Sequence, residues 1–262
     1  MSTDTLVLMY HAVPGSARSA QAADAHYSVA RHRFVQQLAM MHELGLKPRS
    51  VRDLLNDPAG RRVARPLALT FDDGHESNFA AYAEIARLGG SADLFVNPST
   101  VGMRGFLSWA QLRELAAQGA SIQSHGQRHV FLDELPPEAV SEELALSRQR
   151  IADEIDVPAT VFAPPNGRMP PGLIQLAREL GYLAVCSSRV GLWRAGQDAE
   201  IPRFAVLATT SDAQLRGWLL RTPWVMARSR ARALLLDGAK KVLGRRAYVA
   251  LRTRALSSES RT

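Results

Sequence analysis

Short apolar runs rich in branched residues alternate along the chain with segments whose apolar positions recur at helical spacing. Continuous apolar runs of this length are typical of strands that are buried on both faces, as in parallel sheets. The runs are Leu6–Tyr10, Pro66–Phe71, Ala92–Val96, Ala120–Gln123, Ala159–Ala163, Tyr182–Cys186 and Ile201–Val206. The pattern therefore predicts about seven strands.

Helical periodicity fills the intervals between these runs. Phe34, Leu38 and Met41 fall on one helical face, which predicts a helix before the second run. The stretch Glu138–Ile155 follows a Pro-Pro pair, a natural place for a helix to begin. Regular alternation of strands and helices predicts an α/β fold whose parallel strands are covered by helices on both faces.

Polar residues follow four of the predicted strands, at the point where each strand ends. These segments are Tyr10-His11, Asp72-Asp73-Gly74, Ser124-His125-Gly126-Gln127-Arg128-His129 and Pro164-Pro165-Asn166-Gly167. In parallel α/β folds the carboxyl ends of the strands meet at the functional mouth, whether the sheet is open or closed. The four segments are therefore expected to lie close together.

The residue types in these segments suit a metal-dependent hydrolase. His125 and His129 are four residues apart and could present both imidazoles to one ion, although surface histidines share this spacing. One carboxylate and two imidazoles form a facial set that leaves positions open for water and substrate. Because adjacent residues leaving a strand point in different directions, one residue of the Asp72–Asp73 pair can bind the ion. Its neighbour can then act as a general base toward water.

The motifs TFDDG, HGQRH and FAPPNG, in this order and spacing, make the chain resemble the polysaccharide deacetylases of carbohydrate esterase family 4, the NodB homology domain. The likeness runs over roughly residues 5–215. It implies a distorted β/α barrel that hydrolyses acetyl groups on sugars with a divalent metal, usually zinc.

The resemblance also implies a role for each motif residue. Asp72 would be the general base, and Asp73, His125 and His129 would bind the metal. The backbone N–H of Asn166 would help to stabilise the oxyanion of the tetrahedral intermediate.

The resemblance assigns the general acid less directly, because no histidine follows His129 in this chain. The VLMYH motif at residues 7–11 is similar to the Tyr-His motif of a circularly permuted branch of the family, which makes His11 the candidate acid.

Three positions depart from the family pattern. Gly126 stands where a serine or threonine hydroxyl helps to hold the histidine loop, and Ala163 stands where an arginine orients the base. Arg203, from a neighbouring strand, is a candidate replacement for that arginine. Asn166 takes the place of an aromatic residue, which would change how a sugar ring is contacted. We expect activity on an altered substrate.

Charge divides the chain into two parts. Residues 221–262 contain 11 Lys+Arg and 2 Asp+Glu, a balance of +9, whereas residues 1–220 contain 21 and 23, a balance of −2. This predicts a β/α domain over residues 1–220 and a basic helical extension over residues 221–262. Positions that recur every seven residues in the extension are Leu235, Val242, Val249 and Leu256. Such a helix could lie on anionic lipid or pack on the barrel, and a nearly neutral body gives no footprint for nucleic acid.

The cysteine content and the N-terminal pattern indicate the cellular compartment. Cys186 is the only cysteine, which excludes an intramolecular disulfide and a thiolate-rich metal site. The first apolar stretch is too short for the core of a signal peptide and has no basic leader. We therefore expect a cytoplasmic protein, with peripheral contact at the inner membrane face as an option for the basic extension.

The leading hypothesis is a metal-dependent deacetylase acting on an N-acetylated sugar or a sugar-linked biosynthetic intermediate. Alternatives keep the metal site but open amides or cyclic imides, or make the protein a carbohydrate-binding or membrane-associated scaffold impaired by the Gly126 and Ala163 changes. The roles of two further residues are left open by the sequence. His75 could line the pocket or have a solvated or capping role, and the loop of Trp193 could overhang the mouth.

Overall fold

A parallel sheet forms the centre of the computed structural model, which describes residues 4–16 and 23–235. The strand order is β8-β7-β6-β5-β4-β3-β1-β9, with β2 also paired to β3, and each of these pairings is parallel. The strands are β1 (Leu6–Tyr10), β2 (Pro48–Arg49), β3 (Leu67–Phe71), β4 (Asp93–Val96), β5 (Ser121–Ser124), β6 (Val161–Phe162), β7 (Ala184–Cys186), β8 (Glu200–Ile201) and β9 (Phe204–Ala205).

The sheet curls because its two edge strands are almost consecutive in the chain. Only Pro202 and Arg203 separate the end of β8 from the start of β9. Three Cα–Cα steps span at most about 11 Å, so the two edges must come within that distance of each other. The result is a half-barrel, consistent with the distorted β/α barrel predicted from the sequence.

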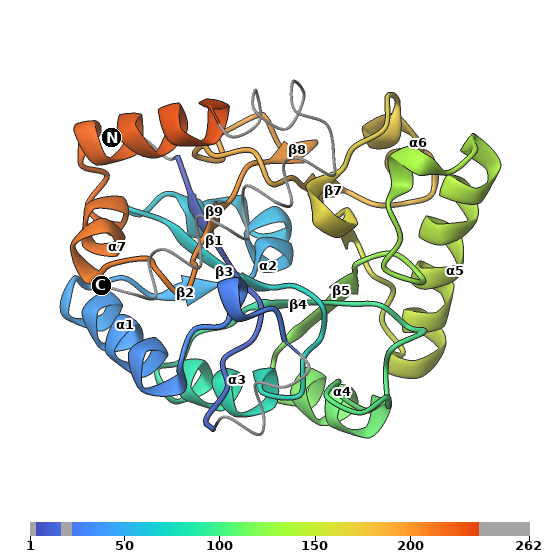
Figure 1. Cartoon of the computed structure of the whole chain (residues 1–262), viewed down its shortest axis with the longest axis horizontal. Helices are drawn as coiled ribbons and strands as arrows, with labels where there is room; N and C mark the ends of the chain where they lie inside the picture. The colour runs from blue at the N-terminus through green and yellow to red at the C-terminus, as the bar shows by residue number, and fades with distance from the viewer. Residues whose placement is uncertain (1–3, 17–22, 236–262) are drawn as a thin grey trace. The chain divides into compact units, whose positions relative to one another are not determined.

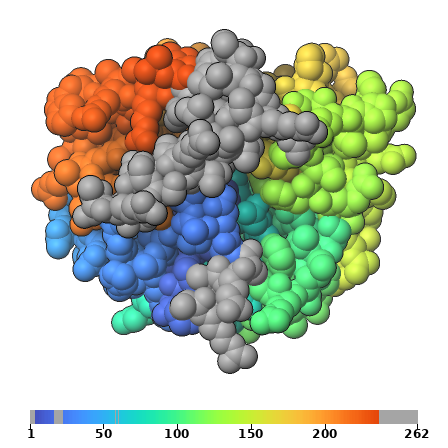
Figure 2. Space-filling view, in the orientation of Figure 1, coloured from blue at the N-terminus to red at the C-terminus, as the bar shows by residue number. Residues whose placement is uncertain are grey.

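Helices surround the strands (Figure 1). In the space-filling view, α1 and α5 lie at opposite sides of the face shown (Figure 2). The α-helices are α1 (Arg31–Glu43), α2 (Val51–Asn56), α3 (Asn78–Arg87), α4 (Trp109–Ala117), α5 (Pro137–Ile155), α6 (Leu173–Glu179) and α7 (Asp212–Leu219). The 3₁₀ helices are η1 (Ala25–Tyr27), η2 (Pro58–Arg61), η3 (Leu132–Glu134) and η4 (Pro165–Gly167).

Local sequence explains where these helices begin and which face they bury. In α4, the Ser108 side chain accepts from the Gln111 N–H while the Gln111 side chain accepts from the Ser108 N–H, forming a capping box. The long helix α5 begins at Pro137, as its sequence predicts, and buries Val140 and Leu144. In α1 the buried apolar side chains are Phe34, Leu38 and Met41, the face that periodicity predicts.

The core lies along the central strands. All five residues of β1 and all five of β3 are buried, so these strands contribute side chains to both faces. Fully burying a leucine or valine contributes about 1.5–3 kcal/mol, and such burial along the central strands supplies much of the driving force for this arrangement. The continuous apolar runs in the sequence reflect this two-sided burial.

Each of the seven predicted runs overlaps at least one strand. The last run, Ile201–Val206, contains parts of two short strands on opposite edges of the sheet, because the chain crosses from β8 to β9 at Pro202 and Arg203. The two-residue strand β2 was not predicted, since Pro48-Arg49 is too short to give a periodic signal.

A buried polar network joins elements at the amino ends of the strands. Asp93 accepts from the N–H groups of Val51 and Arg52, at 2.5 and 3.4 Å, and from Ser121 Oγ at 2.7 Å. Gln123 Nε2 donates to Ser121 Oγ in turn. Burial raises the pKa of Asp93 to about 7, although these donors favour its ionised form.

Trp193 also lies at this end of the strands. It pairs with Thr5, the residue before β1, is fully buried, and donates from Nε1 to Asp198. The Arg61 guanidinium lies 3.8 Å above its ring. The interpretation that the Trp193 loop overhangs the mouth is therefore wrong, because the mouth lies at the carboxyl ends.

The chain divides into two compact units, Met1–Leu220 and Arg221–Thr262. In the second unit, residues 223–235 are helical, and the predicted seven-residue repeat beyond Leu235 lies outside the described residues. None of the helices in the described part of the chain has both the length and the apolar character that a membrane crossing requires.

Candidate metal centre

The predicted metal ligands come from two strands that flank β4. Asp72 and Asp73 follow β3, and His125 follows β5. Both strands run in the same direction, so their carboxyl ends deliver these side chains to one edge of the sheet. His129 returns to the same place after a short loop.

Asp73, His125 and His129 converge on one point. Asp73 Oδ1 lies 3.3 Å from His125 Nε2 and 3.1 Å from His129 Nε2, and the ligand atoms of all three residues lie within 4.8 Å of one another. Asp73 and His129 adopt positive φ angles of 72° and 53°. Non-glycine residues seldom adopt this conformation, and when they do it often serves a functional site.

Hydrogen bonds fix the orientation of His125. Its Nδ1 lies 2.7 Å from the backbone oxygen of Ala163, an acceptor, so Nδ1 carries the proton and the Nε2 lone pair points toward Asp73. The Asn97 side chain donates to the backbone oxygens of His125 and Gly126 and so anchors the start of the histidine loop. The ring is thus held with its metal-binding nitrogen exposed to the other two ligands.

This donor set fits a divalent cation. Asp73 Oδ1 is buried and has no well-aligned hydrogen-bond donor among the described residues, although two imidazole nitrogens lie nearby. Although burial opposes it, the two imidazoles hold the pKa of Asp73 well below its usual range. A carboxylate and two imidazole nitrogens in this arrangement are ligands typical of zinc, with positions left for water and substrate.

Asp72 points elsewhere, into a buried ion pair with Arg203. The Arg203 guanidinium donates from Nη1 and Nη2 to the two carboxylate oxygens at 2.7 and 2.9 Å. It also donates to Thr70 Oγ1 and to the backbone oxygen of Ser187. Burial would raise the pKa of Asp72, but the Arg203 charge outweighs it and lowers the pKa. Arg203 thus occupies the role that Ala163 leaves open.

His11 directly follows β1 and packs against Tyr27, with ring centroids 4.3 Å apart and the ring planes tilted by 31°. Its Nδ1 is buried and has no hydrogen-bond partner among the described residues. Burial lowers the pKa of His11, against the carboxylates of Asp72 and Asp73, which favour the protonated ring. The ring is therefore close enough to both carboxylates to interact with them electrostatically.

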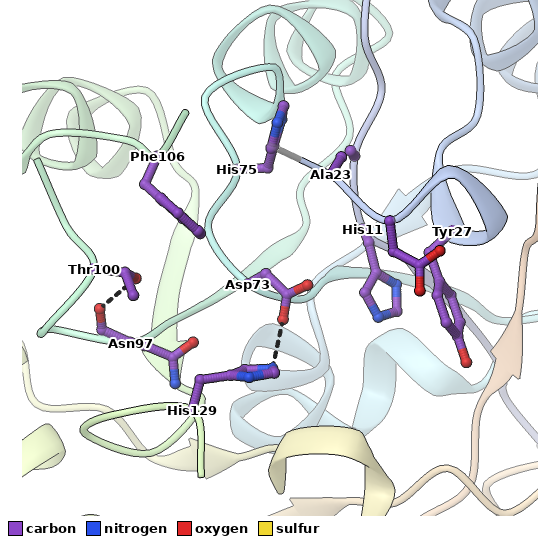
Figure 3. Close-up of a pocket in the computed structure, with 11 residues that line it drawn as sticks. His11, Ala23, Tyr27, Asp73, His75, Asn97, Thr100, Phe106 and His129 are labelled. Carbon is purple, nitrogen blue, oxygen red and sulfur yellow. Dashed lines mark hydrogen bonds and ion pairs between the residues drawn. The ribbon is translucent and has the colours of Figure 1, made fainter. Parts of the chain in front are cut away.

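His11, Asp73 and His129 line a pocket of about 170 Å³ (Figure 3). The labelled side chains surround the Asp73 carboxylate, with His11 and Tyr27 on one side and Asn97 and Thr100 on the other. The other lining residues are Ala12, Ala23, Asp24, His75 and Phe106. An organic ligand in this pocket would therefore lie directly against two of the three proposed metal ligands, Asp73 and His129.

Asn166 sits in η4, directly after β6, with φ 57° and ψ 13°. Its side chain is exposed, and it is not among the residues that line the pocket. The left-handed backbone presents its N–H in a turn, and its role toward an oxyanion stays a prediction.

A carboxylate on α5 holds the histidine loop where Gly126 lacks a hydroxyl. Gly126 has φ +79°, a conformation that glycine adopts without strain. Glu143, which is only 2% exposed, accepts from the backbone N–H of Arg128 at 2.9 Å and from the Arg128 side chain. The loop between the two histidines is thus tied to α5.

Several pocket residues could not be found from the sequence. Tyr27 belongs to η1 and Asp24 is its N-cap, in an irregular segment before α1 that matches none of the motifs. Glu143 lies in a regular helical pattern, where a buried glutamate looks like any other polar position. The arginine partner of Asp72 had a candidate in Arg203, and the structure confirms the contact.

Comparison with known proteins agrees with the geometry. A family model described as polysaccharide deacetylase matches residues 59–185. YxkH of Bacillus subtilis (strain 168), named as a candidate polysaccharide deacetylase, is 27% identical over 180 residues, 67% of this chain and 61% of that protein. The uncharacterized protein SCO4760 of Streptomyces coelicolor is 29% identical over 132 residues, 50% of this chain and 49% of that protein. This chain therefore spans about half to three fifths of the length of these curated relatives.

Solved structures share the fold. The Streptococcus pyogenes deacetylase PplD, in complex with acetate, has a TM-score of 0.73 at 23% identity and covers 85% of this chain and 99% of its own. IcaB from Ammonifex degensii has a TM-score of 0.69 at 24% identity, covering 87% and 97%. At these identities the likeness concerns the fold. Residues 59–185 of this chain match the polysaccharide deacetylase family, and the solved structures share its fold.

Proposed function

We propose that the chain is a metal-dependent hydrolase that removes the acetyl group from an N-acetylated sugar or a sugar-linked biosynthetic intermediate. The observation that carries the proposal is the convergence of Asp73, His125 and His129 beside a pocket, next to an aspartate paired with a buried arginine. The complex of PplD with acetate is consistent with it, because acetate is the product of deacetylation.

Asp73, His125 and His129 would hold the cation, for which zinc is our candidate. When bound, a divalent cation polarises a carbonyl oxygen and lowers the pKa of a water molecule toward neutrality. His125 contributes an imidazole whose orientation is already set by its hydrogen bond to Ala163. Little reorganisation would then be needed on binding.

Asp72 is the proposed general base. Its lowered pKa keeps the carboxylate ionised at neutral pH, and the two Arg203 hydrogen bonds fix its orientation. The carboxylate accepts a proton from the attacking water as the water oxygen bonds to the acetyl carbon. The Asn166 N–H would stabilise the negative charge that develops on the acetyl oxygen.

His11 is the proposed general acid. The bond between the acetyl carbon and the sugar nitrogen breaks, and the leaving nitrogen takes a proton from the protonated ring of His11, the form that the Asp72 and Asp73 carboxylates favour. The Tyr27 ring packed against His11 restricts its rotation, and the pocket gives it access to substrate. This proposed role of His11 rests on the similarity of its Tyr-His motif to that of the permuted branch.

The two departures in the histidine and base motifs do not favour an impaired scaffold. Arg203 pairs with Asp72 in place of an arginine at Ala163, and Glu143 holds the loop that contains Gly126. The Arg203 and Glu143 side chains are both buried. The chain therefore has the contacts that the reaction requires from these two motifs.

Compartment and membrane contact remain proposals. A cytoplasmic location suits a sugar-linked biosynthetic intermediate better than mature cell wall, and the basic residues 221–262 give a candidate contact with an anionic inner membrane face. Nucleic acid is not among the partners we propose.

The test is acetate release from a panel of N-acetylated sugars and sugar conjugates, with a small cyclic imide as the competing substrate. We expect acetate from at least one sugar, loss of release with a chelator, and recovery with added zinc. Asp72→Asn should reduce turnover strongly, whereas Asp212→Asn, at an exposed ion pair with Arg33, should not. Opening of the imide without acetate release from any sugar would reverse the assignment of the bond.

A further inference from the structure

His75 lies in the loop between β3 and α3, two residues after the proposed ligand Asp73. Its backbone pairs with Phe106 in an antiparallel bridge, and its carbonyl accepts from the Asn78 N–H. The residue is 3% exposed and lines the pocket. In Figure 3 it lies on the opposite side of Asp73 from His129, near Phe106 and Ala23. Its position is thus fixed by the fold.

Hydrogen bonds to Ser77 determine which ring nitrogen carries the proton. The Ser77 backbone N–H donates to His75 Nδ1 at 3.1 Å, and a backbone N–H cannot accept. Ser77 Oγ lies 2.8 Å from the same nitrogen and itself accepts from the Val13 N–H at 2.8 Å. The serine proton is therefore also directed at Nδ1. His75 is a neutral ring with its hydrogen on Nε2.

Among the described residues, this Nε2–H has no hydrogen-bond partner. Nε2 is buried and makes no hydrogen bond within the described residues. A buried donor without an acceptor is costly, and such groups in native proteins call for an explanation such as a missing ligand. His75, which carries this donor, is one of the residues that line the pocket beside Asp73 and His129.

We propose that His75 Nε2–H donates a hydrogen bond to an oxygen atom of the bound sugar and so helps to select the substrate. The partner is a hydroxyl, ether or carbonyl oxygen, because a fixed donor is satisfied only by an acceptor. An ammonium group at this position would face donor to donor, so His75 disfavours an already deacetylated amino sugar bound in this orientation. The proposal rests on the proposed function, since it takes the sugar as the occupant of the pocket.

Two amide substitutions separate the roles of the two ring nitrogens. His75→Asn keeps an acceptor near the Nδ1 position for Ser77 and removes the donor at Nε2, whereas His75→Gln keeps a donor near Nε2. With the best sugar substrate, we expect His75→Asn to raise KM about 10-fold, as for one lost neutral hydrogen bond. kcat and zinc content should change little. His75→Gln should stay closer to the wild type in KM.

Substrate analogues identify the partner oxygen: each lacks one hydroxyl, has a methylene group in place of the ring oxygen, or carries a thioacetyl group in place of the acetyl group. One analogue should lose about 10-fold in kcat/KM with the wild type and nothing further with His75→Asn, because the contact is already absent. Equal losses in both proteins for every analogue would overturn the proposal, as would an unchanged KM in His75→Asn. If His75→Asn does not fold, His75→Gln decides: a KM near the wild-type value supports the proposal and a 10-fold increase overturns it.

A direct binding measurement separates this proposal from the proposed function. Failure of the wild type to release acetate from any sugar would count against the deacetylase activity alone. Binding of N-acetylglucosamine, followed by NMR titration of wild type and His75→Asn, then tests His75. Weaker binding by the variant supports the contact, and equal or absent binding in both proteins overturns it.

Discussion

Replacing Arg203 by methionine removes the charge that faces the Asp72 carboxylate. Arg203 is 1% exposed and Asp72 is 3% exposed, so neither group can turn to solvent. The substitution leaves both oxygens of Asp72 without their 2.7 and 2.9 Å partners and also frees the backbone oxygen of Ser187. Breaking a buried ion pair on one side costs about 3–5 kcal/mol, because the remaining charge stays buried and uncompensated.

The assay is urea unfolding of the chelator-treated protein, followed by circular dichroism, so that metal binding does not contribute. We expect Arg203→Met to lower the free energy of unfolding by about 3–5 kcal/mol. Arg31→Met is the control: Arg31 pairs with Glu84 at 2.7 Å, but its side chain is 44% exposed. An exposed pair of this kind contributes about 0–1 kcal/mol.

A double-mutant cycle tests the reason for the loss. Asp72→Asn should rescue part of the cost of Arg203→Met, because the double variant buries no charge at this site. Arg203→Lys should keep the protein more stable than the methionine variant and still lower acetate release, since a lysine cannot make both carboxylate contacts. Costs of Arg203→Met and Arg31→Met within experimental error of each other, or exact additivity in the cycle, would refute the reasoning.

Three further variants test other parts of the account. In the wild type, burial raises the folded pKa of Asp93 from 3.8 to about 7, so the free energy of unfolding falls by about 1.4 kcal/mol for each unit that the pH rises between those values. Asp93→Asn should abolish this pH dependence. Gly167→Ala should cost about 1–3 kcal/mol, because φ is +66° and a Cβ would lie 2.5 Å from Ser188 Cβ. Glu143→Gln should weaken zinc affinity about 10- to 100-fold through the histidine loop, measured by competition with a chelator.

Each of these has a contradicting result. Parallel pH profiles of unfolding for wild type and Asp93→Asn would show that the carboxyl titrates normally. A thermal midpoint for Gly167→Ala equal to that of the wild type would mean that the turn tolerates a side chain. Glu142→Gln, on the exposed neighbouring position, is the control for Glu143→Gln, and equal zinc affinities of the two variants would remove the loop from the account.

The convergence of Asp73, His125 and His129 was predictable because their sequence signals are local. Asp73 and His125 each follow a continuous apolar run, and parallel strands bring the residues after such runs to one edge. The helix α5 could also be predicted, because its Pro-Pro start and its apolar face lie in one continuous segment of the sequence.

Contacts between distant segments are less accessible. The pairing of Arg203 with Asp72 depends on how far the sheet curls between β8 and β9, which no local pattern encodes. The approach of Asp24 to the pocket depends on the path of an irregular segment. The sequence suggests that His75 could line the pocket, but which ring nitrogen carries the proton follows only from the Ser77 contacts.

The central claim is that Asp73, His125 and His129 form a metal centre. Its most direct test is the zinc content of the chain after equilibrium dialysis, compared between the wild type and Asp73→Ala. The account predicts one zinc ion per wild-type chain and none in a folded Asp73→Ala variant. A wild-type chain that retains no zinc, or a variant that retains as much as the wild type, would contradict it.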